Sequence, residues 1–89
     1  MKARIGYVVI TGMMTHMCVD ATVRAAADFG FQVWVAEDAC ATRDLEHNGT
    51  VVPADHVHRA FLAAFKSYGQ VMMSEQVIAR LAAEKANAR

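Results

Sequence analysis

The residues best able to do covalent chemistry lie between Gly12 and Thr22, in the segment Gly-Met-Met-Thr-His-Met-Cys-Val-Asp-Ala-Thr. Thr15 is a suitable N-cap for the helix that the next residues predict, which would place Cys18 at the third helical position. A thiol in a first helical turn faces unpaired N–H groups and the positive end of the helix dipole, and both favour the nucleophilic thiolate. The alternative is that Cys18 is a small buried apolar residue, the commoner fate of a free cysteine.

Three histidines and a second cysteine could each have a chemical or a structural role. His16 precedes Cys18 by two residues, but two ligands without a second pair make a poor zinc site, so we expect no metal and place His16 near a pocket mouth. His56 and His58 are two apart on a predicted helix, point to different faces and are expected to be solvated. Cys40 follows a strand and nothing near it indicates activation, so we interpret it as structural.

Other polar and sulfur-bearing residues leave alternatives open. Asp38 ends a predicted strand and could contact a substrate or stabilise the following turn, and we favour the turn. Asn48-Gly49-Thr50 matches a glycosylation sequon, but Asn-Gly is also a turn dipeptide, which we favour. Met13, Met14 and Met17 could line an apolar substrate wall or fill irregular gaps in a core.

The elements that must position these residues follow from apolar periodicity. Tyr7–Ile10 is a short continuous apolar run, typical of a strand covered on both faces. Residues 31–36, a β-rich apolar run, and 70–73 are predicted as two further short strands. Helices are predicted from Thr15 to Gly30, from Pro53 to Gly69 and after Ser74, which is expected to cap the last of them. Residues 39–52 are predicted as a loop that could contain one helical turn. Their inward faces are expected to contain Val19, Val23 and Ala26; then Val57, Phe61, Ala64 and Phe65; then Val77, Ile78, Leu81 and Ala82.

The element order β-α-β-α-β-α predicts an α/β fold, a parallel sheet with right-handed crossovers. The apolar run Val8–Ile10 carries no charge or proline and suits a central strand with neighbours on both sides. Within the 89 residues, this strand does not find all the neighbouring strands that its sequence suits. We therefore expect a second subunit, or further chain, to cover it.

Composition excludes several classes of function. The chain has 89 residues, 55% of them apolar, and its nine basic residues balance nine acidic ones. That argues against disorder and against nucleic acid or an anionic membrane as the main partner. The longest apolar run, 60–65, has six residues, far below the ~20 that span a bilayer. No basic segment leads into a hydrophobic stretch near Met1, so we expect a cytoplasmic protein.

The stretch from Gly12 to Ala26 closely resembles the nucleophile segment of the isochorismatase-like cysteine hydrolases. That superfamily includes nicotinamidases, N-carbamoylsarcosine amidohydrolases and ureidoacrylate or biuret hydrolases. The resemblance continues through 30–42, the 52–65 helix and the 70–74 strand, from about Tyr7 to about Leu81. It implies a three-layer Rossmann-like parallel sheet, of which residues 1–89 would form the C-terminal half of the domain.

The same resemblance implies roles for individual residues. Cys18 would be the nucleophile, attacking an amide or imide carbonyl of a small molecule to form a thioester that water hydrolyses. A non-proline cis peptide would join Met13 to Met14, and the backbone N–H groups of Met14 and Cys18 would form an oxyanion hole. Thr15, His16 and Met17 become candidates for the substrate pocket. No cofactor is implied, and Cys18 argues against the isochorismate-cleaving branch, which typically lacks it.

The family also uses an Asp as general base and a Lys, both from an N-terminal half that has no counterpart in these residues. Neither Asp20 nor Asp38 lies in a matching context. We therefore carry two hypotheses: a hydrolase of C–N bonds completed by a homo-oligomer or by a missing N-terminal half, and an inactive α/β module for oligomerisation or interaction. In either case, we expect that the isolated chain is not a stable monomer.

Overall fold

The computed structural model describes residues 6–87, with the side chains of residues 6–83. In chain order the elements are β1 (Tyr7–Met13), a π-helical turn (Thr15–Val19), α1 (Asp20–Asp28), β2 (Gln32–Ala41), β3 (Leu45–His47), β4 (Thr50–Val52), α2 (Ala54–Phe65), β5 (Gln70–Met72) and α3 (Ser74–Asn87). β1, β2 and β5 form a parallel sheet in the order β1-β2-β5, and β3 and β4 form a separate antiparallel hairpin. The predicted α/β fold is confirmed.

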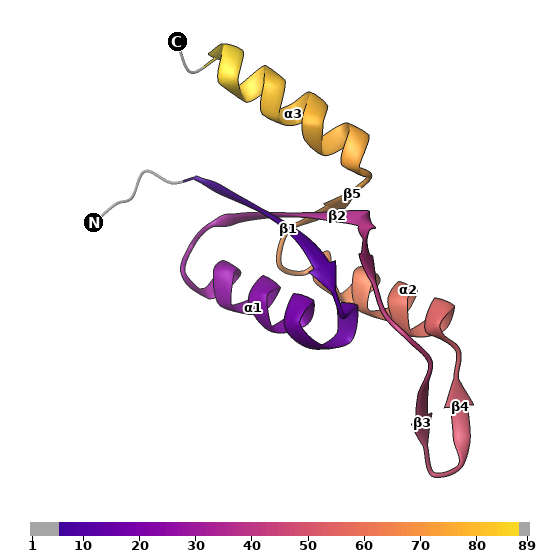
Figure 1. The fold of residues 1–89 in the computed structure, drawn as a ribbon. Coiled ribbons are helices and arrows are strands. Elements are labelled where there is room, and N and C mark those ends of the chain that lie inside the picture. Colours follow the sequence, from indigo (N-terminus) through magenta and orange to yellow (C-terminus); the bar gives the residue numbers. More distant parts are fainter. Residues whose placement is uncertain (1–5, 88–89) are drawn as a thin grey trace.

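The sheet lies between two helical layers, with α1 and α2 on one face and α3 on the other (Figure 1). The side chains of β2 alternate between them. Val33 and Val35 join the core beneath α1 and α2, while Trp34 and Ala36 join the core beneath α3. This two-sided burial explains why residues 33–36 of β2 form a continuous apolar run. None of the helices in the described part of the chain is long and apolar enough to cross a bilayer.

β1 is longer than predicted. It runs three residues beyond Ile10 to Met13, with a register shift at Gly12, whose φ of 125° suits glycine. Among the described strands β2 is central and β1 pairs only with β2, so no described strand lies along the other edge of β1. That a second subunit or further chain covers this edge stays a prediction. Val9, which is opposite Trp34 in the register, is 38% exposed.

The segment predicted as a loop contains more strand than expected. β2 continues to Ala41, and β3 and β4 form a hairpin that projects away from the sheet (Figure 1). Asn48 and Gly49 form its turn with φ of 51° and 80°. Two positive φ values are typical of a type I′ turn, the turn whose twist matches a β-hairpin. The turn prediction is confirmed, but the prediction of an unpaired loop was wrong.

The first two helices largely keep their predicted faces. Val19, Val23 and Ala26 are buried as expected. Gly30, with φ of 87°, ends α1 in a Schellman motif, because the N–H of Phe31 donates to the carbonyl of Ala26 at 3.1 Å. Pro53 is the N-cap of α2 and not a residue of its first turn. The buried face of α2 contains Val57, Leu62 and Phe65, with Phe61 half-buried and Ala64 exposed.

Gly69 is required for a reason other than ending a helix. A Cβ placed on it would lie 2.2 Å from the carbonyl oxygen of Val33. The chain after α2 therefore passes directly against β2 where any side chain would collide with backbone. This close approach lets β5 begin one residue later at Gln70.

The start and the inner face of α3 depart from expectation. Ser74 is the first helical residue and Met73 precedes the helix, with the side-chain oxygen of Gln76 accepting the Met73 N–H at 2.8 Å. Of the four residues expected to face inward only Val77 is buried. Ile78 is 67% and Leu81 is 40% exposed, and Ala82 is exposed as well. The apolar face of α3 is wider than the sheet it covers.

Candidate active site

A turn of π-helix leads from β1 into α1, and it replaces the predicted N-cap. The carbonyl of Met14 accepts the N–H groups of Met17 at 2.9 Å and of Val19 at 3.2 Å. The second bond spans five residues and makes the turn wider than an α-helical one. Such π turns are frequent at functional sites. Met14 occupies the capping position without a side-chain cap, so the prediction that Thr15 caps the helix was wrong.

Thr15 is fully buried, and its hydroxyl is bonded elsewhere. Its Oγ1 lies 3.0 Å from Nδ1 of His58, 43 residues away on α2. Tertiary contact thus takes the hydroxyl from the local cap, because a buried hydroxyl without a partner costs about 1–3 kcal/mol. The bond ties the π-helical turn to α2.

Cys18 lies in this π-helical turn and is exposed, so the alternative that it is a small buried residue is excluded. The Met13–Met14 peptide is cis, the geometry that the family resemblance implies. Met13 and Met17 are largely exposed and Met14 is half-buried. Met13 and Met17 therefore do not fill gaps in a core.

His16 ties the π-helical turn to the end of β2. Its Nδ1 is 2.6 Å from Oγ1 of Thr42, and its ring centroid is 6.1 Å from that of Phe61. The side chain is half-buried. Together with the bond between Thr15 and His58, this contact holds the turn at two consecutive residues, three and two positions before Cys18.

His58 was missed by the sequence analysis, which expected a solvated side chain. It is half-buried against the turn, whereas His56 is exposed as expected. A signal for this was present in the sequence. His58 stands in the helical i, i+3, i+4, i+7 series with Phe61, Leu62 and Phe65, which places it beside the buried stripe of α2.

Behind the turn lies a shallow pocket of about 270 Å³, lined by Cys40, Ala41, Thr42, Ala54, Asp55 and His58. Thr42 and His58 are the two residues that bond the π-helical turn, so the pocket adjoins it. Cys40 packs against the core beneath α1 and α2. Burial raises the pKa of the Cys40 thiol; a hydrogen bond with the Gly12 backbone partly opposes this, and the charge of Asp38 adds to it. A raised pKa disfavours the thiolate form of Cys40, in line with the structural role expected for it.

Asp38 does not stabilise the turn that follows it. Its Oδ1 accepts both the hydroxyl and the backbone N–H of Ser74 at 2.7 Å, so it holds the first residue of α3. The bond from the Ser74 hydroxyl, followed by that from the Ser74 N–H, lowers the pKa of Asp38 below its usual value. The prediction of a local turn was wrong, because the partner lies 36 residues away.

Three further carboxylates have partners as well. Asp20 pairs with Arg24 at 3.0 Å, and Asp55 with Arg59 at 3.4 Å. Asp44 accepts the N–H of Ala54 at 2.7 Å. All four carboxylates therefore have a bonding partner other than Cys18. Within residues 6–83 no group of three or more metal-binding side chains is found.

A parallel sheet between two layers of helices, with an exposed cysteine on the turn after a strand, defines a doubly wound α/β protein. In such folds, ligands bind at the carboxyl edge of the sheet, where this turn lies. The isochorismatase domain model matches residues 1–77. The chain belongs to the isochorismatase family.

Comparison with individual proteins supports the same family. The chain is 52% identical over 68 residues to YddQ, an uncharacterized isochorismatase family protein of Bacillus subtilis, covering 75% of this chain and 38% of YddQ. A structure from Oleispira antarctica described as an isochorismatase hydrolase is 53% identical with a TM-score of 0.81, covering 84% of this chain and 41% of that one. A cysteine hydrolase from Pseudomonas syringae is 27% identical with a TM-score of 0.78, covering 84% and 36%.

The chain therefore spans about two fifths of the length of these relatives. It has the fold of isochorismatase-family hydrolases over nearly its whole described length. The family that the sequence segment Gly12–Ala26 suggested is confirmed.

Proposed function

We propose that Cys18 is the nucleophile of a hydrolase that cleaves the C–N bond of a small amide, carbamoyl or ureido compound. One observation carries the proposal: an exposed cysteine lies on a π-helical turn at the carboxyl end of β1, and two side-chain bonds from other elements hold that turn. A nucleophile that is accessible and held in place is what covalent catalysis requires. The likeness to a protein named as a cysteine hydrolase supports it.

In the proposed reaction the Cys18 sulfur attacks the carbonyl carbon, and the electron pair of the C=O bond moves to oxygen. The N–H groups of Met14 and Cys18 would stabilise that oxyanion, and one such donor is worth about 3 kcal/mol of barrier. Collapse of the intermediate breaks the C–N bond, and the nitrogen leaves with a proton from a general acid. Water then hydrolyses the thioester and regenerates the thiol.

We propose that the proton transfers use groups from outside residues 6–83, because the family resemblance places its Asp and Lys in an N-terminal half without a counterpart here. The four carboxylates already described are bonded elsewhere, and His16 and His58 bond the turn itself. We propose that an Asp and a Lys come from further polypeptide that pairs with the outer edge of β1, either in a second copy or in a segment equivalent to the remaining length of the relatives. No cofactor is needed, and we place the reaction in the cytoplasm.

The second candidate function is that of a catalytically inactive α/β module. In this case the outer edge of β1 serves only oligomerisation or interaction with another protein. The lack of a counterpart to the family's Asp and Lys in these residues favours it, as does the exposed Val9. The two functions differ in the reactivity expected of Cys18.

Iodoacetamide labelling at pH 7, with each cysteine followed by peptide mass spectrometry, tests the proposal. We expect Cys18 to react faster than free glutathione, and Cys40 to react more slowly than both because burial raises its pKa. Cys18→Ser is the matched control and should abolish only the fast phase. If Cys18 is labelled no faster than glutathione, the thiol is not activated and the module hypothesis is preferred.

A further inference from the structure

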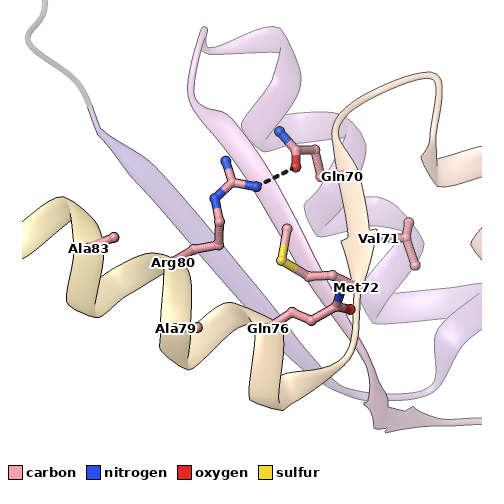
Figure 2. Close-up of a pocket in the computed structure, with 7 residues that line it drawn as sticks. All are labelled: Gln70, Val71, Met72, Gln76, Ala79, Arg80 and Ala83. Atoms are coloured by element: carbon pink, nitrogen blue, oxygen red, sulfur yellow. Dashed lines mark hydrogen bonds between the residues drawn. The ribbon is translucent and has the colours of Figure 1, made fainter.

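A second pocket lies on the opposite face of the sheet from α1 and α2, between β5 and α3 (Figure 2). Its volume is about 470 Å³, within the usual range for small-molecule sites. It is lined by Gln70, Val71, Met72, Gln76, Ala79, Arg80 and Ala83. None of the candidate active-site residues belongs to it.

Two contacts orient Arg80, an exposed residue, at this pocket. Its guanidinium carbon lies 4.9 Å from the ring centroid of Trp34, and its Nη1 donates to Oε1 of Gln70 at 3.0 Å (Figure 2). Stacking on an indole and a hydrogen bond together orient the planar group. A guanidinium has five N–H donors, and the bond to Gln70 uses one. An oriented cation with further donors suits a planar anion.

The two glutamines, like Arg80, present hydrogen-bond donors to the pocket. Oε1 of Gln70 is occupied by Arg80, and Oε1 of Gln76 accepts the N–H of Met73 at 2.8 Å. Because arginine and a backbone N–H can only donate, each amide must use its oxygen there and keep its NH₂ to donate. The polar part of the lining thus presents donors and one positive charge. Among the lining residues whose side chains the structure describes, none is a carboxylate.

The remaining lining is apolar. Met72 forms part of the floor, and Ala79 and Ala83 lie along α3 (Figure 2). We propose that this pocket binds a small monocarboxylic acid with an apolar chain. Arg80 and the amide of Gln70 bind the carboxylate by charge-assisted hydrogen bonds, and the chain lies against Met72 and the alanines. Cys18 plays no part, so the site stands independently of the proposed hydrolysis.

Trp34 is the only tryptophan and touches Arg80, so its emission reports on the pocket. We expect hexanoate to cause a saturable change in emission. Acetate, which lacks the chain, and hexanamide, which lacks the charge, should each bind at least 10-fold more weakly. Cys18→Ser should leave hexanoate binding unchanged, whatever its effect on labelling or hydrolysis.

Two variants locate the site. Arg80→Met keeps an apolar stem on Trp34 and removes the charge, and Gln70→Glu keeps Arg80 but gives it an internal carboxylate partner. Each should weaken hexanoate binding at least 10-fold, whereas Arg59→Met, an exposed cation on α2, should not. Ligand-observed NMR provides a second measurement that does not depend on Trp34. Three results would each overturn the proposal. They are hexanamide binding as tightly as hexanoate, hexanoate binding to Gln70→Glu as tightly as to the natural chain, and an NMR experiment that detects no hexanoate binding.

Discussion

Replacing Thr15 by valine tests whether His58 holds the π-helical turn that contains Cys18. Valine keeps the shape of threonine and removes the hydroxyl that lies 3.0 Å from His58 Nδ1. A hydrogen bond of this kind contributes about 1 kcal/mol net. His58 is half-buried, so water can solvate its freed nitrogen. We expect Thr15→Val to lower the free energy of unfolding by about 1 kcal/mol.

His58→Phe should be more damaging, because it leaves the Thr15 hydroxyl fully buried without a partner, at about 2 kcal/mol. In the double variant valine faces phenylalanine and no polar group is stranded. Thr15→Val should therefore destabilise the natural chain but stabilise the His58→Phe variant, a reversal of sign that only a direct interaction produces.

Urea unfolding followed by Trp34 fluorescence at one protein concentration measures all four free energies. With a slope of about 1 kcal/mol per molar, the first change shifts the midpoint by about 1 M. Thr22→Val, at an exposed threonine of α1, is the control and should stay within about 0.5 kcal/mol. If Thr15→Val destabilises both backgrounds equally, the bond does not hold the turn and the argument is refuted.

Two further predictions concern α3 and the edge of the sheet. Ser74→Ala removes the bond that most lowers the pKa of Asp38, so this pKa should rise toward its ordinary 3.8 in a carbon-detected NMR titration. A lowered pKa of Asp38 stabilises the folded state at pH values above the ordinary pKa of the group. The natural chain should lose this contribution as the pH falls through the lowered pKa, that is, below about pH 4. If the Asp38 titration midpoint is the same in Ser74→Ala as in the natural chain, the bond to the Ser74 hydroxyl is not what lowers this pKa. Val9→Lys should reduce self-association measured by light scattering, whereas Val51→Lys, on the exposed hairpin, should not. A monodisperse natural monomer with a cooperative melt would show that the β1 edge needs no cover.

The sequence predicted those features whose causes are local. The continuous apolar run at 33–36 of β2 indicates burial on both faces. Gly30 indicates the left-handed residue that ends a helix, and Asn48-Gly49 indicates a tight turn. The segment around Cys18 indicated the family by residue type alone. Each of these needed only a few neighbouring residues to be recognised.

The features that were missed depend on distant partners. Thr15 would cap a helix in isolation, but His58 from α2 competes for its hydroxyl and wins because the site is buried. Asp38 would stabilise a local turn, but Ser74 reaches it from another layer. The exposure of Ile78 and Leu81 depends on how much sheet lies beneath α3, which periodicity does not contain.

The alternation of side chains along β2 has a consequence for any attempt to redesign this protein. Four consecutive residues, 33–36, serve as floor for both helical layers, since odd-numbered side chains support the layer that holds the Cys18 turn and even-numbered ones the layer beside Arg80. A slip of one residue would place Trp34 and Ala36 beneath α1 and α2, and Val33 and Val35 beneath α3. Variation meant to alter one face must therefore leave this stretch untouched, and changes confined to the outer surfaces of α1 or α3 can alter each side separately.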